Sequence, residues 1–351
     1  MYNKDLIKDE NIKWVEGTGP HANIVVSSRI RLARNLGGEH FPHRLDTEAQ
    51  KAMVEKLAAS LKLQTVEKLV GALETIPLNV LPPLDKQILI EKHLISPQHA
   101  EPGGYKAVAL NKDGTISIMI NEEDHLRIQV LLSGLQLQEA LRVSDAIDDV
   151  IEGEVDYAFD ESSGYLTSCP TNVGTGLRAS VMMHLPGLVL TRQASRVLSA
   201  LSQVGLTVRG LYGEGTEAAG NLFQVSNQIT LGPGEEEIIN NLSSIAKQLL
   251  DQELEAREGL RKQTGLKFKD RLWRALGILK HARLIDTEEA LRLMSEVRLG
   301  VEMDLIEGID PKIFNSLLVQ IQPGFLQLKA GKELKPTERD AIRAEIIRNK
   351  L

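Results

Sequence analysis

Residues 113–127, with the sequence DGTISIMINEEDHLR, place a turn, a strongly β-like run and a polar cluster one after another. Asp113 and Gly114 are typical of a tight turn, and the apolar run TISIMI at 115–120 is typical of a buried strand. Residues 24–32, with the sequence IVVSSRIRL, predict a second strand. The first part of the chain is therefore expected to contain a sheet.

Helices surround these strands in the sequence. Helical periodicity of apolar side chains covers residues 48–63, 135–151 and 195–204. Strands and helices do not alternate regularly, so the sequence does not indicate a parallel, doubly wound sheet. We expect an α+β fold with a mainly antiparallel sheet flanked by helices.

The pattern changes after the GPG sequence at 232–234. A helical segment runs from Glu235 to about Arg261, and the chain beyond it is almost entirely helical. Local signals predict a capping box at Asp286 and Glu289, an N-cap followed by proline at Asp310-Pro311, a helix stop at Pro323-Gly324 and a helix start at Pro336-Thr337. We predict two domains, residues 1–254 and an all-α domain at 255–351.

The composition excludes several classes of protein. The 351 residues are 42% hydrophobic and 25% charged, and the net charge of −7 does not favour nucleic-acid binding. No apolar run is long enough to span a membrane, and the polar N-terminal sequence does not resemble a signal peptide. Cys169 is the only cysteine, so the chain cannot form an internal disulfide, and we expect a cytoplasmic location.

Two arginines alternate with apolar residues in the strand at 24–32. Arg29 and Arg31 are expected on one face of this strand, with Ile30 and Leu32 on the other. Neighbouring guanidinium groups repel each other unless an anion lies between them, and their geometry suits phosphate oxygens. The alternative is an exposed strand face of solvated arginines.

The acidic cluster NEED at 121–124 follows the β-like run. Three consecutive acids at a strand end suit a magnesium site, a base for a cationic substrate or a solvated helix start. These three interpretations remain open on the residues alone.

Residues 167–180, TSCPTNVGTGLRAS, form the most distinctive motif. Its GTGLRA portion matches a dinucleotide-binding fingerprint by spacing, but Pro170 lies upstream, a β-like run lies downstream and no acid follows at ribose-binding distance. No Gly-Lys-Ser/Thr sequence follows either, which excludes a P-loop. Cys169 is either a reactive thiol or a small buried side chain.

Residues 208–220, VRGLYGEGTEAAG, form a glycine-punctuated loop that carries Glu214. Glycines on both sides of the carboxylate favour a mobile flap that closes over a substrate. An ordinary surface loop is the alternative.

Together and in this order, these motifs resemble the guanidino (phosphagen) kinases: S-x-R-x-R, N-E-E-D-H-x-R, C-P-T-N-x-G-T-x-x-R-A-S and R-G-x-x-x-E. The resemblance covers roughly residues 20–255. It implies a fold of the glutamine synthetase/guanidino kinase type and the phosphorylation of a guanidinium group by MgATP.

The layout of the chain narrows the resemblance. Creatine and free-arginine kinases carry a helical domain before S-x-R-x-R, whereas here that motif begins at Ser27 and a helical domain follows instead. With EKHLISP at 91–97 and VMMHLP at 181–186, the chain resembles the McsB-type bacterial protein arginine kinases. The implied substrates are arginines of proteins. A kinase for free arginine and a non-catalytic binding module are the alternatives, but the motif residues are intact, which argues against the binding module.

The resemblance implies a role for each motif residue. Glu123, as the base, and Glu214 would clamp the guanidinium, and Cys169 would be the reactive thiol beside it. No metal site made by protein ligands is expected, since magnesium would be held mainly by the nucleotide, with Glu122 or Asp124 behind its water ligands. The implied ATP-binding residues are Ser27, Ser28, Arg29, Ile30, Arg31, His93, Arg127, Arg178, Ala179, Ser180, Val181, Met182, Arg209 and Gly210.

The last helix carries the family's R-D-x-x-R-A motif, which implies an allosteric phosphoarginine pocket formed by Arg339, Asp340, Arg343 and Ala344. Two arginines facing one phosphoryl group supply a physical reason, although a solvated charged face is the ordinary alternative. The family also implies a homodimer through the C-terminal helices and three kinds of partner: a zinc-binding activator protein, a stress-gene repressor and a Clp protease that degrades the marked proteins.

Overall fold

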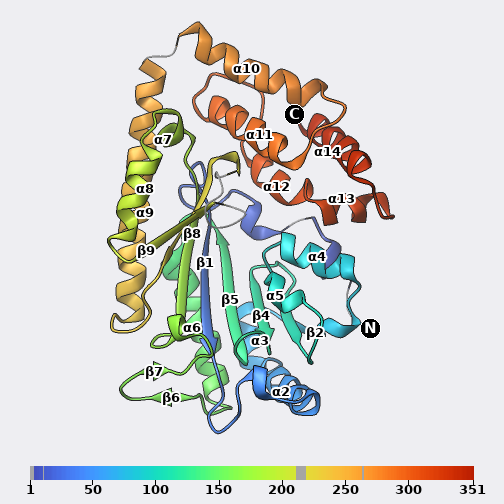
Figure 1. The fold of residues 1–351 in the computed structure, drawn as a ribbon, viewed down its shortest axis with the longest axis vertical. Helices are drawn as coiled ribbons and strands as arrows, with labels where there is room; N and C mark the ends of the chain where they lie inside the picture. The colour runs from blue at the N-terminus through green and yellow to red at the C-terminus, as the bar shows by residue number, and fades with distance from the viewer. Residues whose placement is uncertain (1–3, 11, 211–218, 263–264) are drawn as a thin grey trace.

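The computed structural model describes residues 4–10, 12–210, 219–262 and 265–351. Within these residues an eight-stranded antiparallel sheet forms the centre of the molecule (Figure 1). In order across the sheet, its strands are β2 (Leu73–Pro77), β3 (Ala107–Asn111), β4 (Ile116–Ile120), β5 (Leu126–Ser133), β1 (Val25–Arg34), β8 (Leu177–His184), β10 (Leu222–Asn227) and β9 (Leu206–Gly210). The predicted antiparallel sheet is therefore confirmed.

Helices cover both faces of the sheet. Those before the C-terminal part are α1 (Asp5–Lys8), α2 (Thr47–Ser60), α3 (Gln64–Val70), α4 (Pro83–Glu91), α5 (Pro97–Ala100), α6 (Leu137–Glu152), α7 (Pro186–Leu190), α8 (Ala194–Ser202) and α9 (Glu235–Lys262). The short 3-10 turns are η1 (Lys13–Val15), η2 (Pro42–Arg44), η3 (Leu78–Val80), η4 (Pro170–Asn172) and η5 (Ala219–Asn221), and β6 (Phe159–Asp160) pairs with β7 (Gly164–Tyr165) in a separate hairpin.

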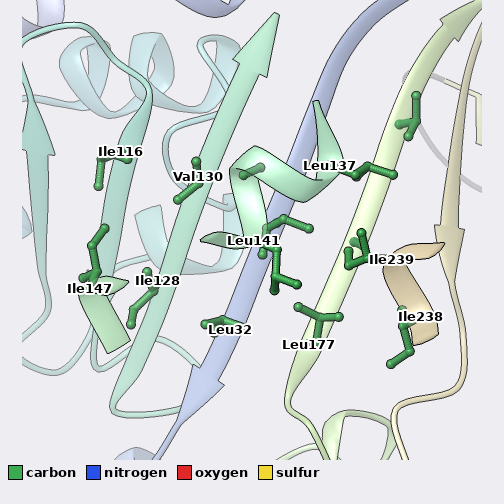
Figure 2. Close-up of a cluster of buried hydrophobic side chains, with 14 of the residues drawn as sticks. Leu32, Ile116, Ile128, Val130, Leu137, Leu141, Ile147, Leu177, Ile238 and Ile239 are labelled. Carbon is green, nitrogen blue, oxygen red and sulfur yellow. The ribbon is translucent and has the colours of Figure 1, made fainter. Parts of the chain in front are cut away.

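The first hydrophobic core lies between one face of the sheet and the helices α2, α6 and α9. Leu32 of β1, Ile128 of β5 and Leu177 of β8 point toward Leu141 of α6 and Ile239 of α9 (Figure 2). Burying each such side chain contributes about 1.5–3 kcal/mol. Because side chains alternate along a strand, this core forces the residues between them onto the opposite face.

A second core lies on that opposite face. There the sheet residues Met119 and Met182 pack with Trp14 of η1 and Ile88 of α4. The same core also includes Val319 and Phe325, which come from the C-terminal helices. The C-terminal part therefore packs directly on the face of the sheet that carries the predicted arginines.

The C-terminal part is all-α, as expected. Its helices are α10 (Leu266–His281), α11 (Thr287–Glu302), α12 (Lys312–Gln320), α13 (Pro323–Ala330) and α14 (Pro336–Lys350), which share a third hydrophobic core. Figure 1 shows them gathered at one end of the molecule, beyond the sheet. In the part of the chain that the structure describes, no helix is long and apolar enough to span a membrane.

Buried ion pairs join the C-terminal helices to the rest of the chain. Arg257 of α9 binds Glu253 at 2.7 Å and Glu302 of α11 at 2.7 Å. Glu302 also binds Arg298 at 2.8 Å, and Arg298 donates a hydrogen bond of 2.9 Å to the carbonyl of Ala22, just before β1. These contacts anchor α11 to the sheet.

Two helix boundaries differ from the sequence predictions. Pro311 is the N-cap of α12, while Asp310 accepts a hydrogen bond from the Lys312 amide at 2.9 Å. Pro323 does not simply stop a helix, because α12 ends at Gln320 and Pro323 is the first residue of α13. Proline suits this position, since the first turn of a helix has no partner for its N–H.

Candidate active site

Four strands place arginine side chains on one face of the sheet. In the strand register Arg31 of β1 lies opposite Arg178 of β8, and Ala33 of β1 lies opposite Arg127 of β5. Arg209 of β9 lies opposite Gln224 of β10. Because side chains alternate between the two faces along each strand, guanidinium groups that are far apart in the sequence lie together on one face of the sheet.

A cavity of about 430 Å³ opens over this row. The cations in its lining are Arg31, Arg127, Arg178 and Arg209, and the same lining includes Glu123 and Cys169. The structure thus brings these predicted residues into one cavity, and their roles stay predictions. Glu214 lies outside the residues that the structure describes, so its predicted place opposite Glu123 stays a prediction.

The arginines lower one another's pKa. Burial, followed by repulsion from Arg127 and Arg178, lowers the pKa of Arg29 to about 10. Burial and the neighbouring arginines also hold the pKa of Arg31 well below the usual guanidinium value. Such concentrated positive charge is costly in the free protein, and it favours binding of a polyanion.

Arg127 is held by two of the three acids that precede it in the motif, Glu122 and Glu123. Glu122 binds one terminal nitrogen of Arg127 at 2.6 Å and Glu123 binds the other at 2.9 Å. The side chain of Glu122 is 5% exposed and accepts a hydrogen bond of 2.6 Å from the hydroxyl of Ser96, whereas the side chain of Glu123 is 43% exposed. Glu122 therefore holds Arg127 without lining the first cavity, whereas Glu123 lines it.

Asp124, the third acid of the motif, has a structural role. Asp124 is fully buried, and its Oδ1 accepts hydrogen bonds from Asn35 Nδ2 at 2.6 Å and from the Ser168 amide at 2.7 Å. The Ser168 hydroxyl donates in turn to the carbonyl of Glu123 at 2.8 Å. These bonds fasten the loop that carries Cys169 beside Glu123. They also correct the expected position of Asp124, which does not face the cavity and cannot assist a magnesium ion there.

Cys169 lies in the lining of the cavity and is partly exposed. Its Sγ lies 3.0 Å from the Thr171 hydroxyl. The interpretation as a fully buried small hydrophobe is therefore wrong.

A second cavity, of about 600 Å³, adjoins the first, and both include Arg31 and Arg127 in their linings. His93 lies in this second cavity with a left-handed backbone conformation (φ 59°), and its carbonyl accepts a hydrogen bond of 2.8 Å from Gln129. Burial lowers the pKa of His93 to about 4, so the ring is neutral at pH 7. The rings of Trp14 and His93 make an edge-to-face contact, with centroids 5.4 Å apart and an angle of 69° between their planes.

Some predicted ATP-binding residues point away from both cavities. Ile30, Ala179 and Val181 lie in the first hydrophobic core, on the far face of the sheet. Ser28 is buried, and its hydroxyl donates to the carbonyl of Gly134 at 2.8 Å. Such residues can only support the site, because alternation along β1 and β8 directs their side chains to the other side.

The other residues of these motifs lie on the face with the arginines. Ser27, Ser180 and Met182 line a small cavity together with Arg29, whose Nε donates to the Ser180 hydroxyl at 3.4 Å. Gly210 is the last residue of β9, directly after Arg209.

The motif of the last helix lies in the C-terminal part, and its two arginines differ. Arg343 is 2% exposed and donates hydrogen bonds of 2.9 Å to the carbonyls of Ile321 and Ile285, besides binding Asp340 at 2.6 Å. Arg339 is partly exposed, and Ala344 is buried. The Nε and Nη1 groups of Arg343 are therefore engaged within the fold, and the pocket formed with Arg339, Asp340 and Ala344 stays a prediction.

Sequence reasoning missed several cavity residues. Trp14, Gln129 and Glu91 line the second cavity, and Gln224 lines the first. The position of Gln224 could have been predicted from its spacing, since Gln224 and Ser226 are two residues apart on β10 and therefore lie on the same face of the sheet, toward the arginines. In the described ranges no group of three or more His, Cys, Asp or Glu side chains is arranged to hold a metal ion.

Comparisons with known proteins bear on both parts of the chain. Residues 52–256 match the family model of the ATP:guanido phosphotransferase C-terminal catalytic domain, and residues 265–351 match that of the protein-arginine kinase McsB C-terminal domain. A protein-arginine kinase from Moorella thermoacetica is 58% identical over 343 residues, covering 98% of both chains. One from Symbiobacterium thermophilum is 55% identical over 347 residues, covering 99% of this chain and 98% of the relative. The crystal structure of lombricine kinase is 26% identical, with a TM-score of 0.58 over 70% of each chain.

Proposed function

The chain belongs to the ATP:guanido phosphotransferases and, within them, to the protein-arginine kinases, and we propose that its two adjoining cavities are the site of phosphoryl transfer. The reaction is ATP-dependent phosphorylation of arginine side chains in proteins. One observation carries the assignment of the site: the arginine-lined cavity also contains Glu123 and Cys169, a carboxylate and a thiol that suit a cationic substrate.

The shared lining suggests how ATP lies. Arg31 and Arg127 belong to both cavities, so a triphosphate bound along them reaches from the second cavity into the first. The γ-phosphoryl group would then lie among Arg127, Arg178 and Arg209. Fixed cations around a transferring phosphoryl group stabilise the charge of its transition state.

The acceptor arginine needs both orientation and deprotonation. A free guanidinium has a pKa above about 12 and is a poor nucleophile while it is charged. Glu123 would bind the planar cation and accept its proton as the nitrogen–phosphorus bond forms and the bond to the ADP oxygen breaks. Glu214 would complete the clamp, with Cys169 contacting the same cation. Good orientation alone can supply about 7–11 kcal/mol of the barrier lowering.

Magnesium is the expected companion of ATP. The oxygen ligands that it prefers are present on the nucleotide itself, and Mg²⁺ commonly keeps several waters when it is bound this way. Glu122 is occupied by Arg127 and Ser96, so the phosphates would hold the ion. The protein's contribution would be to position those phosphates.

The experiment is phosphorylation of an arginine-rich protein with MgATP, read by mass spectrometry under conditions that preserve P–N bonds. Glu123→Ala and Glu214→Ala should each reduce transfer at least about 100-fold, in the range of general-base catalysis. The matched control is Glu139→Ala, which breaks an exposed carboxylate–arginine pair with Arg142 on α6. Full turnover in both Glu123→Ala and Glu214→Ala would refute the assignment. Label on free arginine but not on protein would point to a small-guanidine kinase instead.

The family resemblance suggests further properties that we also propose. Residues 255–351 would serve dimerisation and sensing of phosphoarginine, with partly exposed Arg339 and Asp340 as the accessible part of the pocket and Arg343 as its buried anchor. The protein would act in the cytoplasm in a stress response. Its partners would be a zinc-binding activator, a stress-gene repressor and a Clp protease that degrades the phosphorylated proteins.

A further inference from the structure

The larger cavity is bounded by two parts of the chain that lie far apart in the sequence. Guanidinium groups of Arg29, Arg31 and Arg127 contribute to its lining from the sheet. Another part of the lining comes from the end of α12 and the start of α13, here called the α12–α13 turn: Leu318, Val319, Gln322 and Pro323. Figure 1 shows α13 beside α4, the helix that precedes His93.

Glu91, the last residue of α4 and a residue of the cavity lining, holds one side of this turn. Its two carboxylate oxygens accept hydrogen bonds from the amides of Gly324 at 2.8 Å and Phe325 at 3.1 Å, in the first turn of α13. Gln87 Nε2 donates to the same carboxylate at 2.9 Å. A Cβ atom at position 324 would come within 2.8 Å of Glu91, so glycine allows this close approach. Glu91 therefore caps a helix that begins 232 residues later in the sequence, at Pro323.

Arg343 holds the turn from the other side. Its Nε donates a hydrogen bond of 2.9 Å to the carbonyl of Ile321, immediately before the cavity residues Gln322 and Pro323. Val319 and Phe325 are buried in the second hydrophobic core with residues of α4 and the sheet. The turn is thus fixed by charge-assisted hydrogen bonds on two sides and by apolar packing.

The lining differs in chemistry from that of the first cavity. Besides the three arginines it presents apolar side chains, such as Ile95, Met119 and Leu318, and the amides of Gln98 and Gln322. Flat apolar surfaces with a few amide groups suit a heteroaromatic base, whereas the guanidinium groups suit phosphates. Since Arg31 and Arg127 continue into the first cavity, the base belongs in the second.

We propose that the α12–α13 turn forms part of the wall around the nucleotide base, so that the C-terminal domain completes the ATP site, with Glu91 and Arg343 as positioning residues. This inference rests on the proposed function, since it takes the larger cavity as the nucleotide site. It adds contacts from residues 318–323 to those that the sequence motifs imply. It also makes the affinity for the base, but not for the phosphates, depend on how the C-terminal helices dock.

The test compares two ligands, MgADP and magnesium tripolyphosphate, by titration calorimetry on the full chain. Leu318→Ala removes part of the wall, and Glu91→Gln removes one of the two hydrogen bonds that cap α13. Both variants should weaken MgADP binding, Leu318→Ala by about tenfold, because even one methylene in an apolar pocket can change affinity by that factor. Their affinity for tripolyphosphate should stay within about twofold of the wild type. The KM for ATP should rise while kcat at saturating ATP is retained.

Two matched controls exclude a general loss of structure. Leu305→Ala shortens a half-buried leucine of the C-terminal core that does not line the cavity. Glu338→Gln weakens the cap of α14, where the carboxylate accepts from the Lys335 amide at 2.8 Å. Neither control should change the affinity for MgADP.

The outcomes separate this inference from the proposed function. If both test variants kept the wild-type affinity for MgADP, or lost as much affinity for tripolyphosphate as for MgADP, the α12–α13 turn would not form part of the wall around the base. The assignment of the cavity as the nucleotide site would be unaffected. A wild-type chain that bound neither ligand would overturn the nucleotide site itself.

Discussion

Replacing Asp124 should disrupt catalysis although this side chain touches neither cavity. Its Oδ1 accepts two hydrogen bonds, from Asn35 at 2.6 Å and from the Ser168 amide at 2.7 Å, and the residue is fully buried. The second bond fixes the residue directly before Cys169. The variant Asp124→Ala removes both hydrogen bonds, whereas Asp124→Asn only weakens them.

The magnitude follows from the two bonds. A hydrogen bond to a charged group contributes about 1.5–3 kcal/mol, so Asp124→Ala should lower the free energy of unfolding by roughly 3–6 kcal/mol. Asp124→Asn keeps an acceptor in place but loses the charge, which roughly halves the strength of each bond. The milder variant should therefore remain folded and allow activity to be measured.

Activity should fall further than stability suggests. Ser168 also donates to the Glu123 carbonyl, so a shift of this loop moves Cys169 relative to Glu123. A displacement of about 1 Å in a reacting group can cost about 100-fold in rate. We expect Asp124→Asn to lower kcat by up to about 100-fold. Binding of MgADP should be unchanged, because the arginine row is untouched.

The assay combines protein-arginine phosphorylation with calorimetry of MgADP binding and urea unfolding. Asp46→Ala is the matched control, since Asp46 caps α2 by accepting from the Ala49 amide at 2.8 Å and lies outside both cavity linings. It should cost about 1 kcal/mol of stability and leave kcat unchanged. A folded Asp124→Asn protein with wild-type kcat would refute the argument that this carboxylate positions Cys169.

Three further predictions concern charge. Arg31→Met should raise the melting temperature of the free protein, because burial, followed by repulsion from the neighbouring arginines, disfavours the charge of Arg31 and lowers its pKa, while MgADP affinity measured by calorimetry should fall. Burial lowers the pKa of His99 to about 4, so its contribution to stability is complete above pH 6.5 and is lost as the pH falls toward 4. In urea unfolding, His99→Gln should reduce the slope of stability against pH by about 1.4 kcal/mol per pH unit and leave the slope due to the other histidines with lowered pKa values, such as His93. Arg298→Met leaves Glu302 with one partner fewer and breaks the bond to Ala22, so scanning calorimetry should show a loss of about 3–5 kcal/mol, with the C-terminal helices melting first.

The face of the arginines was predictable because it depends on a local rule. The sequence SSRIRL alternates, and the structure places Arg29 and Arg31 toward the cavities and Ile30 and Leu32 in the core. The antiparallel fold class was predictable for a related reason, since strands and helices follow no regular alternation. The register that brings Arg178 opposite Arg31 was not, because it depends on how strands separated by about 150 residues pair.

Local signals failed where a distant partner decides the structure. The sequence around Asp124 is acidic, and a magnesium site, a base and a solvated helix start all stayed open on the residues alone, yet Asp124 is buried and its Oδ1 binds Asn35 and a loop 44 residues away. The buried position of Arg343 was missed in the same way. The sequence shows which charged side chains a segment contains, but their burial in the fold decides which of them can bind a ligand.

Pro323 shows most directly why the C-terminal wall of the cavity could not be read from the sequence. Proline and glycine in succession usually end a helix, and nothing nearby supplies a side-chain cap for a new one. The cap comes from Glu91, at the end of a helix in the other domain. Glu91 and His93 both line the second cavity, so the contact that caps α13 is made at the edge of that cavity. Loss of such a cap typically costs a helix about 1 kcal/mol, so this contact contributes to the stability of α13. The C-terminal helices and the second cavity therefore share a long-range contact that local sequence signals do not reveal.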